Sequence, residues 1–527
     1  MFSNIDEEGT HRMARMAFKP DSSFFRKIAM GAVGARSVCQ DLARHGHAIV
    51  ELERGATDTK LWKDVKRKRV RIPDLVCLNC GLRVESRAKT DTDLTMSHSP
   101  TEESRAWDFG MVGEDLIAFP ICEVRAEETW TNGVLNDGLS DWHERNQIEW
   151  HLSGRINYFR VESFRSTPPA RTNTKGVTEG SETAISWNAV FSSRDGTVER
   201  AADDRITIRR TSDGHRYTWK VPLGQRVVVT NGEEVSENQV IASSVEPVAA
   251  LALRCPEVHS QAWLEQCLSS RERTIRFTGV KLARLTQNSA PQELIRNLGN
   301  DPVEDVYTRL EAASYLVAVC GESCESLFGE YCQSNDPQTQ LEAVIALGEA
   351  ATPDAVAKLA AILHDTSQAY FLRSAAAWSL ARTPSPQAVS HLVRAFSDVD
   401  PDLREEALDG IMAIGGTAVP LLAAGLRDAD SNVAAGSAEA LRRQSDLSDD
   451  ALSAILAGLS EGKSSTWTAW LLGHLPRERL ATAASDLQVS APELHFAINV
   501  MWAFAESWIA RNWEFWPAGH RKESARV

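Results

Sequence analysis

The sequence lacks the features that would place the protein in a membrane or outside the cell. Its 527 residues contain no run of 18 uninterrupted apolar residues, which argues against a transmembrane helix. The opening stretch, MFSNIDEEGTHRMARM, is charged and has no apolar signal-peptide core. Nine cysteines, an odd and scattered set, are too few for the disulfide framework of a secreted protein. We therefore expect a cytoplasmic protein with reduced thiols.

Several common catalytic motifs are also missing. The chain has no Walker motif, dinucleotide fingerprint, H-E-x-x-H or nucleophile elbow, so nucleotide hydrolysis, nicotinamide redox chemistry and zincin proteolysis are poor candidates. A composition of 43% hydrophobic and 24% charged residues excludes global disorder and collagen-like repetition. The length predicts three or four domains.

Positive charge is scarce except near the N-terminus. The formal net charge is -15, yet residues 1–90 hold 18 Lys and Arg against 11 Asp and Glu. A basic module on an acidic body predicts a polyanion partner, and we expect DNA. The densest stretch contains the predicted nucleic-acid-binding residues Lys60, Lys63, Lys66, Arg67, Lys68, Arg69 and Arg71. The alternative for this stretch is a solvated basic loop.

The C-terminal half repeats itself. Five segments align on a small residue that is followed four positions later by Leu or Ile, one helical turn onward. The small residues are Ala312, Ala343, Ala376, Ala407 and Ser437. A second amphipathic segment follows in each unit, and turn-forming pieces such as SNDPQ, DVDPD and DADSN separate the units. This pattern predicts pairs of helices that recur about every 31 residues.

A single helical pair cannot bury its own apolar stripe, so such repeats predict a stacked α-solenoid. The units resemble short bacterial HEAT-like repeats, a type also found in phycobilisome lyases, over residues 300–485. The resemblance implies a scaffold that binds a protein partner. We expect the tryptophan-rich residues 486–527 to form a capping helix and tail, with an aromatic contact surface as the alternative.

The middle of the chain is predicted to be rich in β-strands. Residues 166–250 contain short alternating runs separated by turn sequences such as SRDG, TSDG and TNGEE. Part of this region resembles the paired hairpins of barrel-sandwich hybrid domains, which carry lipoyl or biotinyl groups on a lysine. The corresponding tip here is Asn231-Gly232-Glu233, so we expect a structural module without a covalent cofactor. Residues 251–299 are expected to connect it to the solenoid.

Residues 22–165, which follow an N-terminal tail of residues 1–21, are predicted to form an α/β domain. A helix capped by Ser22 or Ser23 and stopped by Gly46 precedes several strands. Two of these strands form a hairpin around Asn79 and Cys80, in which the numbers of paired residues sum to 159. This register places Asp74 opposite Glu85, and alternation puts Arg87 and Lys89 on the same face as Glu85.

Two facing carboxylates are suited to chemistry on phosphodiesters. They can share Mg²⁺ or Mn²⁺, which activates a bound water and neutralises a scissile phosphate, while a neighbouring cation stabilises the transition state. The helix, the Pro73-Asp74 dipeptide and the hairpin to Glu85 resemble the PD-(D/E)xK nuclease superfamily. The resemblance implies that Asp74 and Glu85 bind the metal. The family's lysine is replaced by Arg87, so Lys89 is expected to take its place.

A zinc site is also predicted, less specifically, from the sequence CLNCG. Cys77 and Cys80 resemble half of a zinc knuckle, in which thiolates and turn N–H groups converge on one ion. Two more ligands are needed, and His98 and Cys122 are the neighbouring candidates, without convincing spacing. A turn that happens to contain cysteines is the alternative.

The predicted fold class is multidomain α+β, with an N-terminal α/β nuclease-like core, a central β module and a C-terminal α-solenoid. We expect a metal-dependent nuclease-like protein, a possible Mg-dependent endonuclease that acts on DNA, whose HEAT-like scaffold binds a partner in bacterial DNA processing or defence. The alternative is a non-catalytic HEAT-repeat adaptor with a degenerate nuclease fold.

Overall fold

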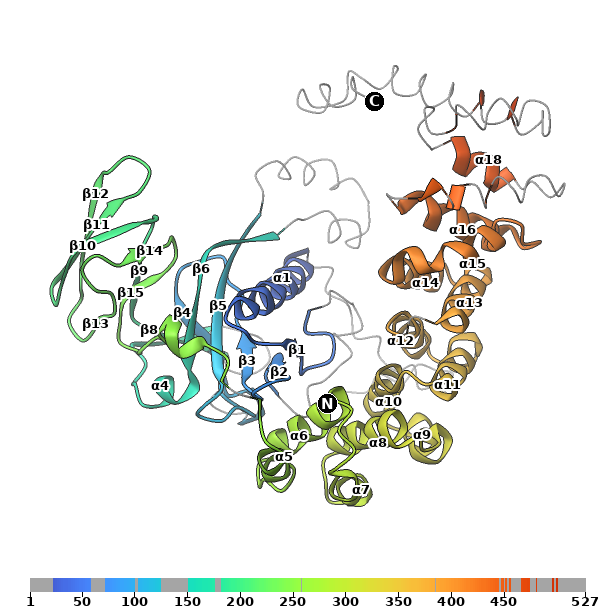
Figure 1. The fold of residues 1–527 in the computed structure, drawn as a ribbon, viewed down its shortest axis with the longest axis horizontal. Helices are drawn as coiled ribbons and strands as arrows, with labels where there is room; N and C mark the ends of the chain where they lie inside the picture. The colour runs from blue at the N-terminus through green and yellow to red at the C-terminus, as the bar shows by residue number, and fades with distance from the viewer. Residues whose placement is uncertain are drawn as a thin grey trace, which may run out of the picture. The chain divides into compact units, whose positions relative to one another are not determined.

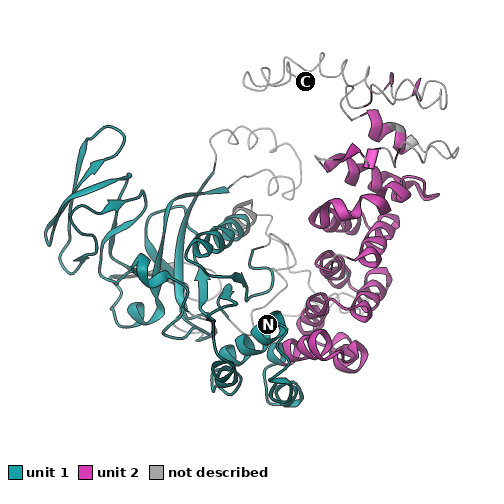
Figure 2. Cartoon of the chain, viewed as in Figure 1, with its two compact units in different colours: residues 1–63, 67–308 teal, residues 64–66, 309–527 magenta. Residues whose placement is uncertain are grey.

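The structure is a computed structural model of the full chain, whose fold is drawn in Figure 1. It describes residues 22–57, 72–99, 103–124, 150–175, 182–256, 258–383 and 385–444, together with short stretches between residues 447 and 500. The chain forms two compact units, which divide close to Thr308 (Figure 2). The first is a mixed α+β unit and the second is helical.

A five-stranded mixed sheet forms the centre of the first unit. It follows helix α1 (Ser22–Arg44), which ends before Gly46 (φ +85°). The strands are β1 (Ile49–Glu51), β2 (Leu75–Cys77), β3 (Arg83–Ser86), β5 (Leu116–Val124) and β6 (Trp150–Arg160), in that spatial order. Neighbouring strands are antiparallel except β3 and β5, which are parallel. A parallel pair needs a long crossover, and the chain between β3 and β5 supplies it.

Helix α1 lies against one face of this sheet (Figure 1), because its apolar side chains and those of the strands share one core. That core contains Val38 and Leu42 from the helix, with Leu75 and Val84 from neighbouring strands. The pairs Leu75–Val84 and Val76–Arg83 confirm the predicted register, in which paired numbers sum to 159. Extending this register by one residue puts Asp74 opposite Glu85.

Helices that follow the β-rich region also belong to the first unit. They are α5 (Gln261–Leu268), α6 (Arg273–Leu285) and α7 (Gln292–Asn300). Helix α6 is tied to the sheet by polar contacts: Arg83 donates hydrogen bonds to Thr274 and Thr278, and Lys281 donates one to the carbonyl of Leu52. Arg83 and Val84 alternate along β3, so α6 and α1 contact side chains that project to opposite faces.

The central β-rich region extends the first unit with three smaller sheets. One consists of β4 (Leu94–His98), β8 (Glu182–Trp187) and β7 (Arg171–Lys175). It therefore joins residues on both sides of the predicted boundary at 165. Short helices η2 (Glu103–Arg105), α4 (Val161–Arg165) and η5 (Ala250–Leu253) lie in the connections.

The other two sheets pack face to face around a single apolar core. The first contains β12 (Arg216–Lys220), β11 (Arg205–Arg210), β10 (Gly196–Ala202) and β14 (Glu234–Val235). The second contains β13 (Arg226–Val227), β15 (Val240–Ser243) and β9 (Ala189–Phe191). The shared core, with Ile206 and Ile208 on one side and Ile241 on the other, makes this part a small β-sandwich.

Helical pairs stack along the second unit. They are formed by α8 (Val306–Cys320), α9 (Cys324–Cys332), α10 (Pro337–Ala350), α11 (Pro353–His364), α12 (Tyr370–Ala381), α13 (Pro386–Arg394), η6 (Ala395–Ser397), α14 (Pro401–Ile414), η7 (Gly415–Ala418), α15 (Val419–Gly425), α16 (Ser431–Arg443) and α18 (Thr466–Gly473). Asp336, Asp400 and Asp430, in the predicted turns, cap α10, α14 and α16 by accepting a backbone N–H.

The five predicted small residues of the repeats are fully buried. Close approach explains the small size of Ser437, because a methyl group added at Gly425 of α15 would clash with its Oγ. Residues 401–425 contain an 18-residue stretch, a third of it buried, that is apolar enough to pass for a membrane span. These residues form α14, η7 and α15, and Leu403, Ile411 and Leu422 are buried.

Candidate metal centre

The two predicted catalytic carboxylates take different partners. One Asp74 carboxylate oxygen accepts a hydrogen bond from the backbone N–H of Ser86 at 2.9 Å. Glu85 forms an ion pair with Arg87 at 3.3 Å, and both side chains are largely buried. Arg87 also donates a hydrogen bond to the carbonyl of Trp107 at 2.8 Å. The register of the adjacent pair Leu75–Val84 agrees with the predicted hairpin, while a shared metal at these carboxylates remains a prediction.

Lys89 is held beyond the end of β3. Its Nζ donates hydrogen bonds to the Asp93 carboxylate and to the carbonyl of Thr95, both at 2.5 Å. It also lies 5.9 Å from the centre of the Phe119 ring. For Lys89 to act at Glu85, as the nuclease resemblance implies, these contacts would have to be given up. The predicted nucleic-acid-binding residues, Lys60 to Arg71, lie outside the described residues.

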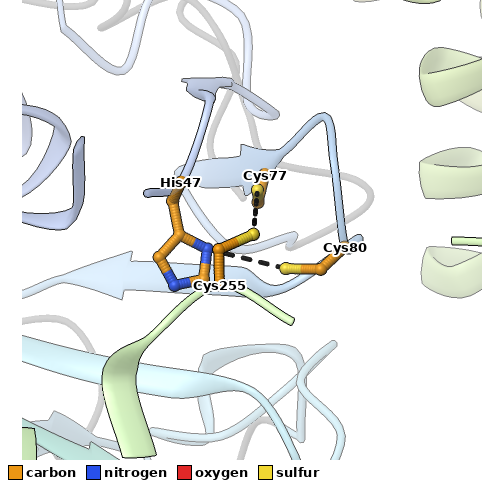
Figure 3. Close-up of side chains that lie close together, drawn as sticks. All are labelled: His47, Cys77, Cys80 and Cys255. Carbon is orange, nitrogen blue, oxygen red and sulfur yellow. Dashed lines mark hydrogen bonds between the residues drawn. The ribbon is translucent and has the colours of Figure 1, made fainter. Parts of the chain in front are cut away.

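A cluster of one histidine and three cysteines lies at the turn of the same hairpin (Figure 3). His47 precedes β1, Cys77 ends β2, Cys80 lies in the turn, and Cys255 lies between the β-rich region and α5. Their ligand atoms all lie within 4.8 Å of one another. Within the described ranges, this is the group of three or more His, Cys, Asp and Glu side chains close enough to hold one ion.

Two separations between the ligand atoms match those around a tetrahedral zinc ion. Zn–S bonds of about 2.3 Å and Zn–N bonds of about 2.0–2.1 Å, at tetrahedral angles, require S···S separations of about 3.8 Å and S···N separations of about 3.6 Å. The sulfurs of Cys77 and Cys255 are 3.9 Å apart, and the sulfur of Cys80 lies 3.5 Å from Nδ1 of His47. These two separations match those of a tetrahedral zinc site, and all the others are within 4.8 Å.

The imidazole of His47 is oriented for binding through Nδ1. Its Nε2 lies 2.8 Å from the carbonyl oxygen of Leu253, which can only accept a hydrogen bond, so Nε2 carries the proton. In the neutral ring Nδ1 is then the acceptor, and it lies 3.5 Å from the sulfur of Cys80. A backbone carbonyl that fixes the free nitrogen of a metal-binding histidine is a common outer contact in metal sites.

Hydrogen bonds and burial shift the pKa values of the three thiols in the cluster. A hydrogen bond from the Cys80 thiol holds the pKa of Cys77 well below its ordinary value, and the contact with His47 adds to this effect. The same bond to the Cys77 sulfur raises the pKa of Cys80. Burial raises the pKa of Cys255. A bound cation would displace the remaining thiol protons.

Backbone hydrogen bonds hold the ligand-bearing segments together independently of the side chains. The N–H of Cys255 donates to the carbonyl of His45 at 2.9 Å, and that of His259 donates to the carbonyl of Asn79 at 2.7 Å. Within the turn, the N–H of Gly81 donates to the carbonyl of Cys77 at 2.9 Å. Gly81 has φ +74°, in the left-handed region where glycine is favoured.

The sequence indicated half of this cluster and missed the rest. His98 and Cys122, the neighbouring candidates without convincing spacing, lie outside the cluster: the histidine ring accepts a hydrogen bond from the N–H of Trp107, and Cys122 is buried in β5. The position of His47 follows from β1 pairing with β2, since Ile49 lies opposite Cys77. Cys255 comes 175 residues after Cys80, and no local pattern links them.

Comparison with known families identifies the repeats of the second unit. The family described as HEAT repeats matches residues 324–412 and 371–442. The C-terminal half contains HEAT repeats. They correspond to helices α9 to α16, and they confirm the helical scaffold predicted from the period of the sequence. Comparison with curated protein sequences gives no match.

Some solved structures also resemble part of the chain. The Escherichia coli protein YibA is 13% identical, with a TM-score of 0.24, and the match covers 46% of this chain and 92% of that protein. The CpcE–CpcF complex of phycocyanin lyase from Nostoc is 17% identical, with a TM-score of 0.18, over 47% and 88%. A designed armadillo repeat protein bound to a (KR)4 peptide is 17% identical, with a TM-score of 0.18, over 46% and 99%.

Proposed function

We propose that this protein is a HEAT-repeat scaffold that binds a basic protein segment through its solenoid. The observation that carries the proposal is the charge of the repeats themselves. Residues 309–444 contain 18 Asp and Glu against 9 Lys and Arg, a net charge of -9. A negative field of this kind attracts a basic partner and repels nucleic acid.

Some of the acidic residues in the repeats stabilise helices, and the experiment must distinguish this role from binding of a partner. Asp336, Asp400 and Asp430 cap helices, and acidic residues near helix N-termini are favourable in any helical protein. Glu330 and Asp402 are exposed and are not N-caps. Charge at these two positions can therefore be reversed without removing a cap, although Asp402 lies in the first turn of α14, where its reversal also removes a favourable interaction with the helix N-terminus.

Binding of a labelled Lys/Arg-rich peptide to the full chain tests the proposal. We expect salt-sensitive binding, and at least about a threefold loss of affinity in Glu330→Lys/Asp402→Lys, given the strength of exposed charge pairs. The matched control is Asp203→Lys/Asp204→Lys, which makes the same charge change at exposed residues of the β-sandwich. Equal losses in the two variants, or no binding by the wild type, would contradict a solenoid site.

The second candidate function is metal-dependent cleavage of DNA by the first unit. It is supported by the hairpin pair Leu75–Val84, since one more pair in the same register would bring Asp74 opposite Glu85, in a mixed sheet that carries α1 on one face. The resemblance to PD-(D/E)xK nucleases rests on the same elements. Lys89 is engaged with Asp93, and Glu85 with Arg87, so an active site would require these ion pairs to rearrange.

A cleavage assay with Mg²⁺ and Mn²⁺ on supercoiled, linear and single-stranded DNA tests this second function. Activity should disappear in Glu85→Gln and persist in Glu123→Gln, which changes an exposed glutamate near the end of β5. Cleavage that survives Glu85→Gln would rule out this site. Salt-sensitive DNA binding without cleavage would favour a degenerate nuclease fold, the adaptor alternative.

A further inference from the structure

We propose that His47, Cys77, Cys80 and Cys255 bind a single structural zinc ion that fastens the β2–β3 hairpin to the chain leading into α5. Three thiolates and an imidazole form a donor set that prefers zinc over magnesium, calcium or manganese, which favour oxygen ligands. The distances and the orientation of His47 described above fit that ion. This proposal is independent of the proposed partner binding and of DNA cleavage.

The site is closed, which assigns it a structural role. All four tetrahedral positions are filled by protein side chains, whereas catalytic zinc sites keep one position for water or substrate. His47 and Cys77 are buried, with exposed fractions of 5% and 0%. The ion would thus sit under the hairpin turn, with Cys80 and Cys255 on its more accessible side.

The position of the ligands along the chain determines what the ion would do. Cys80 and Cys255 enclose the rest of the mixed sheet and the whole β-sandwich between them. Zinc at this point would therefore close a loop of about 175 residues and join the β2–β3 hairpin to the segment that precedes α5. Since the four ligands come together only in the folded unit, the free energy of zinc binding would add to the stability of that unit.

The first experiment measures metal in the full chain purified from zinc-supplemented culture. We expect one zinc per chain by elemental analysis. Replacement of zinc by Co²⁺ should give visible absorption of a tetrahedral site with thiolate-to-cobalt charge transfer. This measurement uses the wild-type protein, so it does not depend on a variant that folds poorly.

Variants then assign the site to these residues. Cys255→Ser should lower zinc affinity by at least about 100-fold, which is more than the loss of an outer contact of a metal site causes. It should also lower the Tm of the first unit by roughly 5 °C or more. Cys39→Ser is the matched control, because Cys39 is a partly buried free cysteine of the same unit that lies outside the cluster. It should keep the full zinc content and cobalt spectrum.

Three results would overturn the proposal. The first is wild-type protein that contains no zinc and takes up no Co²⁺ with thiolate character. The second is zinc retained equally in Cys255→Ser and Cys39→Ser. The third is a disulfide among Cys77, Cys80 and Cys255 in protein purified without oxidant, because a disulfide removes the thiolates that the ion needs.

Discussion

Removal of Arg83 should destabilise the first unit more than removal of other ion-paired arginines. Its guanidinium forms two hydrogen bonds with Asp115, at 2.8 Å and 2.5 Å, and the two side chains are only 2% and 4% exposed. Arg83 also donates to Thr274 and Thr278 of α6, at 3.2 Å and 3.4 Å. One side chain thus links β3, the segment before β5, and α6.

The expected loss follows from what Arg83→Met leaves behind. Asp115 would remain buried without a cation, which costs about 3–5 kcal/mol, equivalent to a fall in Tm of about 6–20 °C at about 2–4 °C per kcal/mol. The control is Arg44→Met. Arg44 is 75% exposed and lies 3.5 Å from Asp41, so its loss should cost less than about 1 kcal/mol.

The assay is urea unfolding at pH 7, followed by hydrogen–deuterium exchange in peptides from β3 and α6. This readout assigns the loss of stability to the first unit. The double variant Arg83→Met/Asp115→Leu should recover most of the loss, because it removes the unpaired charge together with its partner. Our reasoning is refuted if the double variant is as unstable as Arg83→Met, or if Arg83→Met costs no more than Arg44→Met.

The stability that Arg83→Met loses relative to the wild type should also depend on pH. Burial raises the pKa of Asp115 despite the attraction of Arg83, and loss of Arg83 removes the main group that opposes this rise. When folding raises the pKa of a carboxyl, the folded state becomes less stable as the pH rises above the pKa of that group in the unfolded chain, about 3.9 for Asp. The loss of stability is complete once the pH exceeds the pKa in the folded state. The difference between Arg83→Met and wild type should therefore shrink from pH 7 to pH 5.

Two further predictions concern a glycine and a histidine. Gly81→Ala should lower the Tm clearly more than Gly214→Ala: both residues have positive φ, but a methyl group at Gly81 would lie 2.1 Å from the Trp263 ring, whereas nothing lies within 4 Å at Gly214. Equal shifts in thermal unfolding would mean that backbone strain alone accounts for the loss. In the solenoid, burial lowers the pKa of His364 from 6.5 to about 4, so its contribution to stability is present above pH 6.5 and is lost as the pH falls toward 4. Replacement by Leu should remove about 1 kcal/mol of the difference in unfolding free energy between pH 7 and pH 5, allowing for partial exposure. If the His364→Leu variant and the wild type depend on pH in the same way, then other titratable groups cause that dependence.

The repeats and the hairpin register were determined by the sequence itself. A period of about 31 residues, with a small residue and a Leu or Ile one turn later, is local information that any stacked helical pair must satisfy. Ala343 and Ala376 are fully buried, as that pattern requires. The turn at Asn79 and Cys80 likewise determines which residues face each other on β2 and β3, since the side-chain period of a strand is two.

Only the tertiary structure decided which side chains meet. Cys255 reaches Cys77 and Cys80 because the chain returns to the hairpin after the whole β-sandwich, and no pattern of spacing encodes that return. Lys89 shares the predicted face with Glu85, yet the nearby Asp93 takes its ammonium group. Local periodicity determines elements and faces, whereas contacts between distant segments and the choice among charged partners depend on how the whole unit packs.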